Sequence, residues 1–220
     1  MNTSINNDSK LAETLVVGAE ALGLALSQQQ QQKLLAYLSL MAKWNRTYNL
    51  TALREPAQMM SHHLLDSLAA VQAFAGAANV LDVGAGGGLP GIVLAIWAAE
   101  AYPSMRVSMI DTVHKKTAFL TQAKAELQLS NVSVYTARVE ALQVDQPFDV
   151  ITSRAFAELN DFINWSQHLL VPGGRYIAMK GLLPQDEIAR LPAGWQVIKT
   201  EALRVPGLDA ERHLVFIEKA

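Results

Sequence analysis

The chain has 220 residues, is 50% hydrophobic and carries a formal net charge of −2 at pH 7. It contains no cysteine, which excludes a disulfide framework, a thiolate metal site and a cysteine nucleophile. Its apolar runs are too short to span a membrane and its first ten residues are polar, so we expect no membrane segment, no signal peptide and a cytoplasmic location. The near-neutral charge does not exclude nucleic-acid binding, because a local basic patch can be hidden in the total.

The first third of the chain has the apolar spacing of helices. From residue 11 to residue 74 apolar residues recur every three or four positions, as in residues 33–44. Ser27 precedes a run of glutamines and is expected to cap the helix that follows. Residues 61–74 are predicted to form another amphipathic helix. We therefore predict that residues 1–78 are a helical extension packed on a core domain formed by residues 79–220.

In the rest of the chain, short apolar runs typical of strands alternate with helical segments. The predicted strands are residues 80–83, 107–110, 132–135, 150–152 and 176–179, and the predicted helices are residues 89–101, 115–129 and 159–170. This alternation predicts an α/β fold with a parallel sheet covered by helices on both faces. Residues 194–203 and 212–219 follow as two strands without a long helix between them. The expected sheet is therefore mainly parallel and seven-stranded, with an antiparallel last strand.

Residues 82–88 form an Asp-x-Gly-x-Gly-x-Gly segment between the first predicted strand and its helix. Gly84, Gly86 and Gly88 permit positive φ angles and close approach of a ligand, and ligands bind at this edge of open parallel sheets. Asp111 ends the second predicted strand, where its carboxylate can accept hydrogen bonds from the ribose hydroxyls of an adenosine. Two alternatives remain: a glycine-rich turn without a ligand, and an Asp111 that caps the next helix.

The residue type at position 89 distinguishes between two classes of nucleotide-binding motif. A dinucleotide-binding Gly-x-Gly-x-x-Gly would place its third glycine at this position, which is Leu89. The even glycine spacing that begins two residues after Asp82 resembles instead the first motif of class I S-adenosylmethionine-dependent methyltransferases, which have a Rossmann-like fold. That resemblance implies that Asp82 helps to position the methionine portion of the cofactor. An NAD-dependent oxidoreductase is the less favoured alternative.

Seven segments extend a more specific resemblance over nearly the whole chain. They are residues 43–56, 62–68, 82–92, 111–120, 153–162, 173–181 and 211–219. On these segments the chain resembles the ribosomal small-subunit methyltransferase G family, formerly called glucose-inhibited division protein B. The resemblance implies transfer of a methyl group from S-adenosyl-L-methionine to N7 of guanine 527 in bacterial 16S rRNA. The Gly-Gly-Gly at residues 86–88 departs from the proline or alanine often found at its centre, but it keeps the outer glycines.

The resemblance also assigns residues to the cofactor. By position, the cofactor contacts of the family fall on Gly84, Leu89, Val139, Glu140 and Arg154. Gly84 and Leu89 bracket the loop, Val139 and Glu140 follow the third predicted strand, and Arg154 ends the fourth. The alternatives are core packing for Val139 and a helix first-turn acid for Glu140.

Cationic residues gather where the predicted strands end, and these ends share one rim of the sheet. They are Arg138, Arg154, Lys180, Lys115 and Lys116. We expect these side chains to bind RNA phosphates, and we expect Arg154 and Lys180 to position the substrate. Phe156 is either a stacking partner for the target base or a core residue.

The expected reaction needs alignment more than proton transfer. Guanine N7 carries an in-plane lone pair, so no proton leaves before methyl transfer and no catalytic general base is expected. The absence of cysteine excludes the usual covalent route to pyrimidine C5 methylation. Residues 153–156 also lack the Pro-Pro-aromatic turn typical of exocyclic-amine methyltransferases.

The expected partner is 16S rRNA in the small ribosomal subunit, with no membrane and no metal ion, and the chain is expected to act as a monomer. A second hypothesis, from a different class, is a non-catalytic RNA-binding or assembly module on a methyltransferase fold. The intact glycine loop and Asp111 favour the enzyme.

Overall fold

The computed structural model describes residues 2–220, with side chains from residue 8 onward. Within this range the helices are α1 (Asn2–Ala21), α2 (Gln28–Tyr48), α3 (Pro56–Met59), α4 (Asp66–Leu68), α5 (Gly91–Ala101), α6 (His114–Glu126), α7 (Leu159–Ser166) and α8 (Gln185–Ala189). The strands are β1 (Asn79–Val83), β2 (Arg106–Asp111), β3 (Val132–Thr136), β4 (Phe148–Arg154), β5 (Leu170–Lys180), β6 (Trp195–Leu203) and β7 (Arg212–Lys219).

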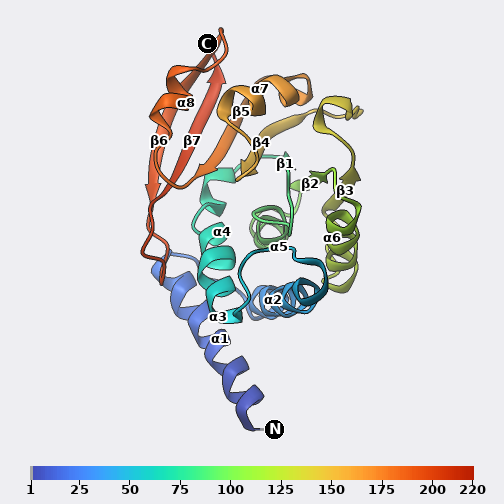
Figure 1. Ribbon diagram of the computed structural model, residues 1–220, viewed down its shortest axis with the longest axis vertical. Coiled ribbons are helices and arrows are strands. Elements are labelled where there is room, and N and C mark those ends of the chain that lie inside the picture. Colours follow the sequence, from blue (N-terminus) through green and yellow to red (C-terminus); the bar gives the residue numbers. More distant parts are fainter. Residues whose placement is uncertain (1) are drawn as a thin grey trace.

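Within the described residues, seven strands form one twisted sheet in the order β3-β2-β1-β4-β5-β7-β6 (Figure 1). The first five strands are parallel, and β7 lies antiparallel between β5 and β6. The register places Lys180, at the end of β5, opposite His213, at the start of β7. The predicted fold class is therefore confirmed, and its antiparallel strand begins at the edge where the parallel strands end.

The two faces of the sheet are covered by different helices. Along β1, Val80 belongs to a core formed with α2, α5 and α6, whereas Leu81 belongs to a second core formed with α7. This alternation is the two-residue period of a strand with both faces buried. The sheet is thus the central layer of three (Figure 1).

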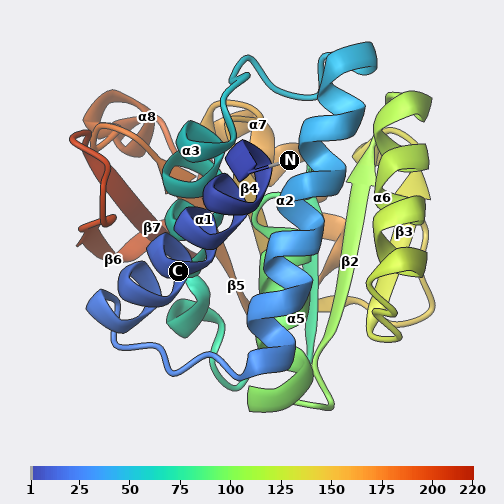
Figure 2. The same cartoon turned by 90° about the horizontal axis from the view of Figure 1, so that it is seen from below.

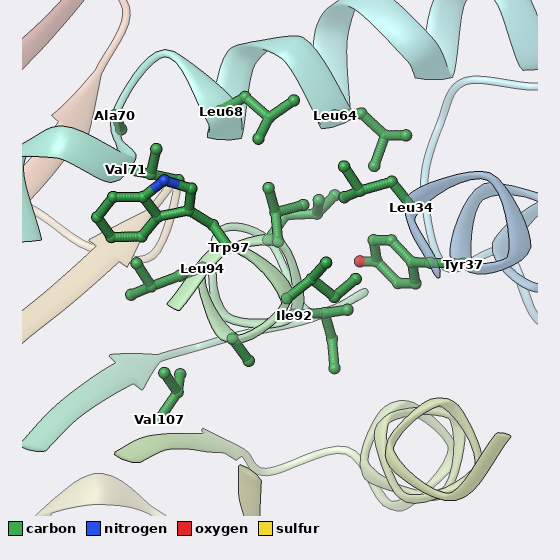
Figure 3. Close-up of a cluster of buried hydrophobic side chains, with 14 of the residues drawn as sticks. Leu34, Tyr37, Leu64, Leu68, Ala70, Val71, Ile92, Leu94, Trp97 and Val107 are labelled. Carbon is green, nitrogen blue, oxygen red and sulfur yellow. The ribbon is translucent and has the colours of Figure 1, made fainter. Parts of the chain in front are cut away.

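The N-terminal helices and the α/β segment share one of these cores. Helix α2 contacts both α5 and α6 and lies beside them in Figure 2. Leu34 and Tyr37 of α2 and Leu64 approach α5 from outside the sheet, as Figure 3 shows. Residues 91–98 of α5 are consequently all buried, as expected for a helix that is apolar on every side.

The start of α2 follows its sequence closely. The Ser27 hydroxyl accepts a hydrogen bond from the Gln30 backbone N–H (3.1 Å), and the Gln30 side chain accepts one from the Ser27 N–H (2.9 Å). This reciprocal pair is a capping box. The predicted cap is therefore confirmed.

The predicted helix over residues 61–74 is wrong in detail. The segment consists of a π-helical turn (Met60–Leu65), the short α4 and a 3-10 turn (Val71–Phe74). Within the π-helical turn the carbonyl of His62 accepts a hydrogen bond from Arg154 Nη1 (3.1 Å). The π-helical turn thus contacts Arg154 at the end of β4. Apolar periodicity alone did not indicate this turn.

Candidate functional site

The glycine loop joins β1 to α5 at the carboxyl edge of the sheet. Gly84, Gly86 and Gly88 have φ angles of +68°, +56° and +87°, in the region that side chains disfavour. A Cβ at Gly84 would lie 2.3 Å from the ring of Phe156, whereas one at Gly86 would meet nothing closer than 3.8 Å. The loop therefore needs glycine for its conformation, and at Gly84 also for close packing.

Gly88 has a structural part in this loop. A Cβ there would lie 2.6 Å from Ile92 and 2.8 Å from Leu120, so the glycine lets the loop pack against α5 and α6. It lines neither of the two cavities described below. Its expected contact with a cofactor stays a prediction.

Asp82 lies beneath the loop. Its side chain is fully buried, and Oδ2 accepts a hydrogen bond from the Gly91 N–H at the start of α5 (2.9 Å). Oδ1 has no hydrogen-bond partner among the described residues. Burial raises the pKa of this carboxyl to about 7. Asp82 lines neither cavity and holds the loop and the helix start together. Its expected role in positioning a methionine group stays a prediction.

Asp111 connects the end of β2 to the glycine loop. Oδ2 accepts a hydrogen bond from the Gly86 N–H (3.0 Å) and faces Lys116 Nζ (3.4 Å), while Oδ1 accepts one from the Val113 N–H (2.9 Å). Helix α6 begins at His114 with Val113 as its N-cap residue. Asp111 therefore supports the turn before α6 without being its N-cap, and its carboxylate remains at a cavity wall.

That wall belongs to a cavity of about 390 Å³, here called the Asp111 cavity. Its lining includes Asp111, Val113, Arg138, Val139, Glu140, Phe156 and Trp165. Val139 packs in the second core, where it is 4% exposed, and also lines the cavity. Its contact with a cofactor stays a prediction. Phe156 packs edge-on against Phe162 and Trp165 and covers Gly84, which places it on this cavity.

A second hollow of about 450 Å³, here called the Arg154 cavity, adjoins the first. Its lining includes Met41, Thr51, His63, Leu89, Arg154, Met179, Lys180 and Arg212. Gly84, Lys116 and Ala155 line both cavities, so the two form one continuous depression. The structure thus brings Leu89, Arg154 and Lys180 together, but on a different wall from Val139 and Glu140.

Most of the predicted cationic residues are divided between the two cavities, and most of them form ion pairs with carboxylates. Arg154 donates to the buried Asp66 (2.9 Å), and Lys180 donates to Glu187 (2.7 Å) and to the carbonyl of Ala157 (3.1 Å). Lys116 faces Asp111 between the two cavities. Arg138 and Lys115 are exposed, and Lys115 lines neither cavity.

Four polar or charged residues of the Arg154 cavity or its support were not among the predicted site residues. They are Thr51, His63, Asp66 and Arg212. Arg212 was accessible to sequence reasoning, because an antiparallel strand after β5 must begin at the edge where β5 ends. Thr51 and His63 were not, since helical periodicity does not indicate which loop of an extension reaches a sheet edge.

His63 is a neutral member of this wall. Burial, and next the charge of Arg154, lower its pKa to about 4. Its Nδ1 lies 3.0 Å from the carbonyl oxygen of His62, and its Nε2 lies 2.8 Å from the hydroxyl of Thr51. A proton on Nδ1 satisfies the carbonyl, so Nε2 accepts from Thr51.

Residues 2–220 contain neither a membrane-spanning helix nor a metal-ligand cluster. Within them, no helix combines the length and apolarity that a bilayer crossing requires. The same residues contain no cluster of three His, Asp or Glu side chains with the spacing of metal ligands.

The strand order, the glycine loop and the acid at the end of β2 define a class I S-adenosylmethionine-dependent methyltransferase fold. Solved structures with this fold are similar to the chain. TrmN from Thermus thermophilus superposes with a TM-score of 0.54 at 21% identity, over 73% of this chain and 53% of that one. An O-methyltransferase from Bacillus cereus, solved in complex with SAH, gives 0.55 at 19% identity, over 84% and 91% of the two chains.

The family model for GidB, described as rRNA small subunit methyltransferase G, matches residues 30–215. The chain is 72% identical to ribosomal RNA small subunit methyltransferase G from Janthinobacterium sp. (strain Marseille) over 209 residues, covering 95% of each chain. It is 69% identical to the protein of that name from Herminiimonas arsenicoxydans, over 95% of this chain and 96% of the relative. The chain belongs to the rRNA small subunit methyltransferase G family, as its seven sequence segments predicted.

Proposed function

We propose that this protein transfers the methyl group of S-adenosyl-L-methionine to N7 of guanine 527 in 16S rRNA of the small ribosomal subunit. Membership of the family supports methylation of ribosomal RNA, and the seven similar segments support the position and the atom. The observation that carries the proposal is the pair of adjoining cavities, one with a carboxylate and one with cations.

The residues of the Asp111 cavity fit the adenosine part of the cofactor. Oδ1 of Asp111 accepts only from the Val113 N–H, so it retains capacity for a ribose hydroxyl. Val139 offers an apolar surface and Glu140 an acceptor at the far wall, and Phe156 closes the side over Gly84. When bound, S-adenosylmethionine supplies an electrophilic methyl group. Asp111, Val139 and Glu140 are the residues that we propose to hold it.

The Arg154 cavity provides the remaining space for a guanine. Leu89 and Met179 are apolar walls, and the neutral His63 adds no charge beside a base that becomes cationic on N7 methylation. No proton has to be removed from N7, so these residues act by orienting the base and excluding water. Arg154 and Lys180 are held by Asp66 and Glu187 in fixed positions along this wall.

Methylation of the small subunit also implies where and in which form the protein acts. Ribosomal RNA is a cytoplasmic substrate in bacteria, so we propose a cytoplasmic enzyme. We also propose that the enzyme acts as a monomer.

The proposal is tested on ribosomal RNA from cells with and without the gene. N7-methylguanine becomes labile after borohydride reduction, so aniline should cleave wild-type 16S rRNA at position 527. RNA from a deletion strain should lack this cut, a plasmid copy should restore it, and a copy carrying Gly84→Val should not. Identical cleavage in wild-type and deletion RNA would reject both the position and the atom.

A further inference from the structure

Asp66 joins three distant segments beneath the Arg154 cavity. Its side chain is 1% exposed and does not line the cavity. Oδ2 accepts from Arg154 Nη1 (2.9 Å) at the end of β4, and Oδ1 accepts from Arg212 Nε (2.7 Å) at the start of β7. One buried carboxylate therefore fixes two guanidinium groups, and both of those side chains line the cavity.

The charges of this cluster do not cancel. Two arginines share one carboxylate, which leaves one net positive charge at the cavity wall. Lys180 differs, because Glu187 lies 2.7 Å from its Nζ and neutralises it. Half-buried arginines with an excess positive charge at a cavity wall attract a ligand of opposite sign.

Donor capacity also remains on Arg212. Its Nε donates to Asp66, and its Nη1 donates to the carbonyl of Glu211 (2.8 Å). These are its hydrogen bonds to the described residues, so Nη2 is available to a ligand. At 24% exposure, the side chain is half-buried and still reachable from solvent.

We propose that Arg212 binds a phosphodiester of the substrate RNA next to the target nucleotide, with Asp66 holding its guanidinium beside Arg154. A planar guanidinium fixed through one nitrogen presents its other N–H groups to phosphate oxygens in a defined direction. This inference rests on the RNA substrate of the proposed function, but not on the position or the atom that is methylated.

A phosphate fits this position better than the guanine base itself. Arginine commonly binds the O6 and N7 edge of guanine, but an N7 engaged by a donor could not act as nucleophile. The carboxylate of the cofactor is the other anion that could occupy the cavity. It is the competing ligand that the experiment must separate from RNA.

The test compares Arg212→Ala, Arg212→Lys and the wild type in two binding measurements. The RNA probe is the 30S subunit from the deletion strain, and S-adenosylmethionine binding is followed by calorimetry. For Arg212→Ala we expect about tenfold weaker 30S binding at 0.1 M salt and a salt slope reduced by about 1, with the cofactor dissociation constant changed less than twofold. Arg212→Lys should restore the slope but only part of the affinity, because it keeps the charge and loses the planar fork.

Arg190→Ala is the matched control, since Arg190 is an exposed arginine that lines neither cavity. It should leave both measurements unchanged. Weaker cofactor binding with unchanged 30S binding in Arg212→Ala would overturn the inference, as would no change in either. If Arg212→Ala does not fold, the same comparison is made with Arg212→Lys, and an unaltered 30S affinity there counts against the inference. Transfer of tritiated methyl groups to 30S subunits by the wild type is measured in parallel, and its absence would reject the proposed function separately.

Discussion

The two cavities differ in how far apart their residues lie in the sequence. The lining of the Asp111 cavity comes entirely from residues 83–165, at the ends of β1 and β2, in the segments that follow β1 to β4, and at Trp165 of α7. The lining of the Arg154 cavity extends from Met41 to Arg212 and includes the N-terminal extension and the last strand. One cavity is therefore a product of the α/β core, and the other exists only when both ends of the chain pack against that core.

This difference suggests a division of function between the two sites. Strand-end loops in this type of sheet are the general location for a nucleotide-like ligand. Segments that are added before and after the core can differ between families without disturbing those loops. We therefore expect the core to determine the cofactor and the added segments to determine the nucleic-acid substrate.

Gly84→Val should have the largest effect, because Gly84 lines both cavities. The valine would have to adopt a φ of +68° and displace the ring of Phe156, which lies 2.3 Å from the Cβ position. We expect cofactor binding to be abolished in calorimetry. Gly173→Val is the control, since Gly173 has a φ of +77° but open space around it. Normal binding by Gly84→Val would show that the loop is only a turn.

Asp82→Asn should change the pH dependence of stability. The folded pKa of Asp82 is about 7 against an ordinary value of 3.8, so the folded state binds the proton more tightly. The wild type should therefore lose stability relative to Asp82→Asn as the pH rises from about 4 through 7, by about 4 kcal/mol in total. Urea unfolding of both proteins at pH 5 and pH 8 should show about 2.6 kcal/mol of this loss, because the unfolded carboxyl is already mostly ionised at pH 5. Parallel pH profiles would show that the carboxyl ionises normally.

Asp66→Asn should damage the Arg154 cavity and spare the Asp111 cavity. Removing the shared carboxylate leaves Arg154 and Arg212 without their partner, at an expected cost of about 3 kcal/mol of unfolding free energy. Glu201→Gln is the control, since its ion pair with Lys199 is exposed and should contribute little. Equal stability of the two variants would show that the ion pairs of Asp66 with Arg154 and Arg212 do not stabilise the fold.

Asp111→Ala addresses the other side of the comparison. We expect S-adenosylmethionine binding to weaken by about 2 kcal/mol, because ribose hydroxyls and the Gly86 N–H lose an acceptor. The affinity for 30S subunits should change little, since Asp111 does not line the Arg154 cavity. An unchanged cofactor dissociation constant in the folded variant would restrict Asp111 to supporting the turn before α6.

The sequence also predicted the lining of the Asp111 cavity better than the lining of the Arg154 cavity. Asp111, Val139 and Glu140 follow strands whose order is set by βαβ topology, so their meeting could be deduced from spacing. The partners of the cationic residues could not be deduced in this way. That Asp66 pairs with Arg154 and Arg212 depends on how the π-helical turn docks on the sheet edge, which local periodicity does not encode.

Asp82 shows the same limit inside the core. Its position two residues before Gly84 suggested a ligand contact, but its direction was not determined by the motif. A strand residue points to alternate faces, and here the carboxylate points at the Gly91 N–H. The motif thus indicated where the glycine loop lies, but the hydrogen bond between Asp82 and Gly91 could not be deduced from it.

The enclosure of α5 imposes an order on folding during synthesis. Helix α2 leaves the ribosome before α5 has been made. Leu34 and Tyr37 therefore cannot pack against α5 until more than 50 further residues have been synthesised. Tyr37 donates a hydrogen bond to the carbonyl of Gly87 and therefore cannot complete its contacts before the glycine loop exists. The extension and the core consequently mature as one cooperative unit, and a chain cut at the predicted boundary after residue 78 would expose an apolar α5 and should aggregate.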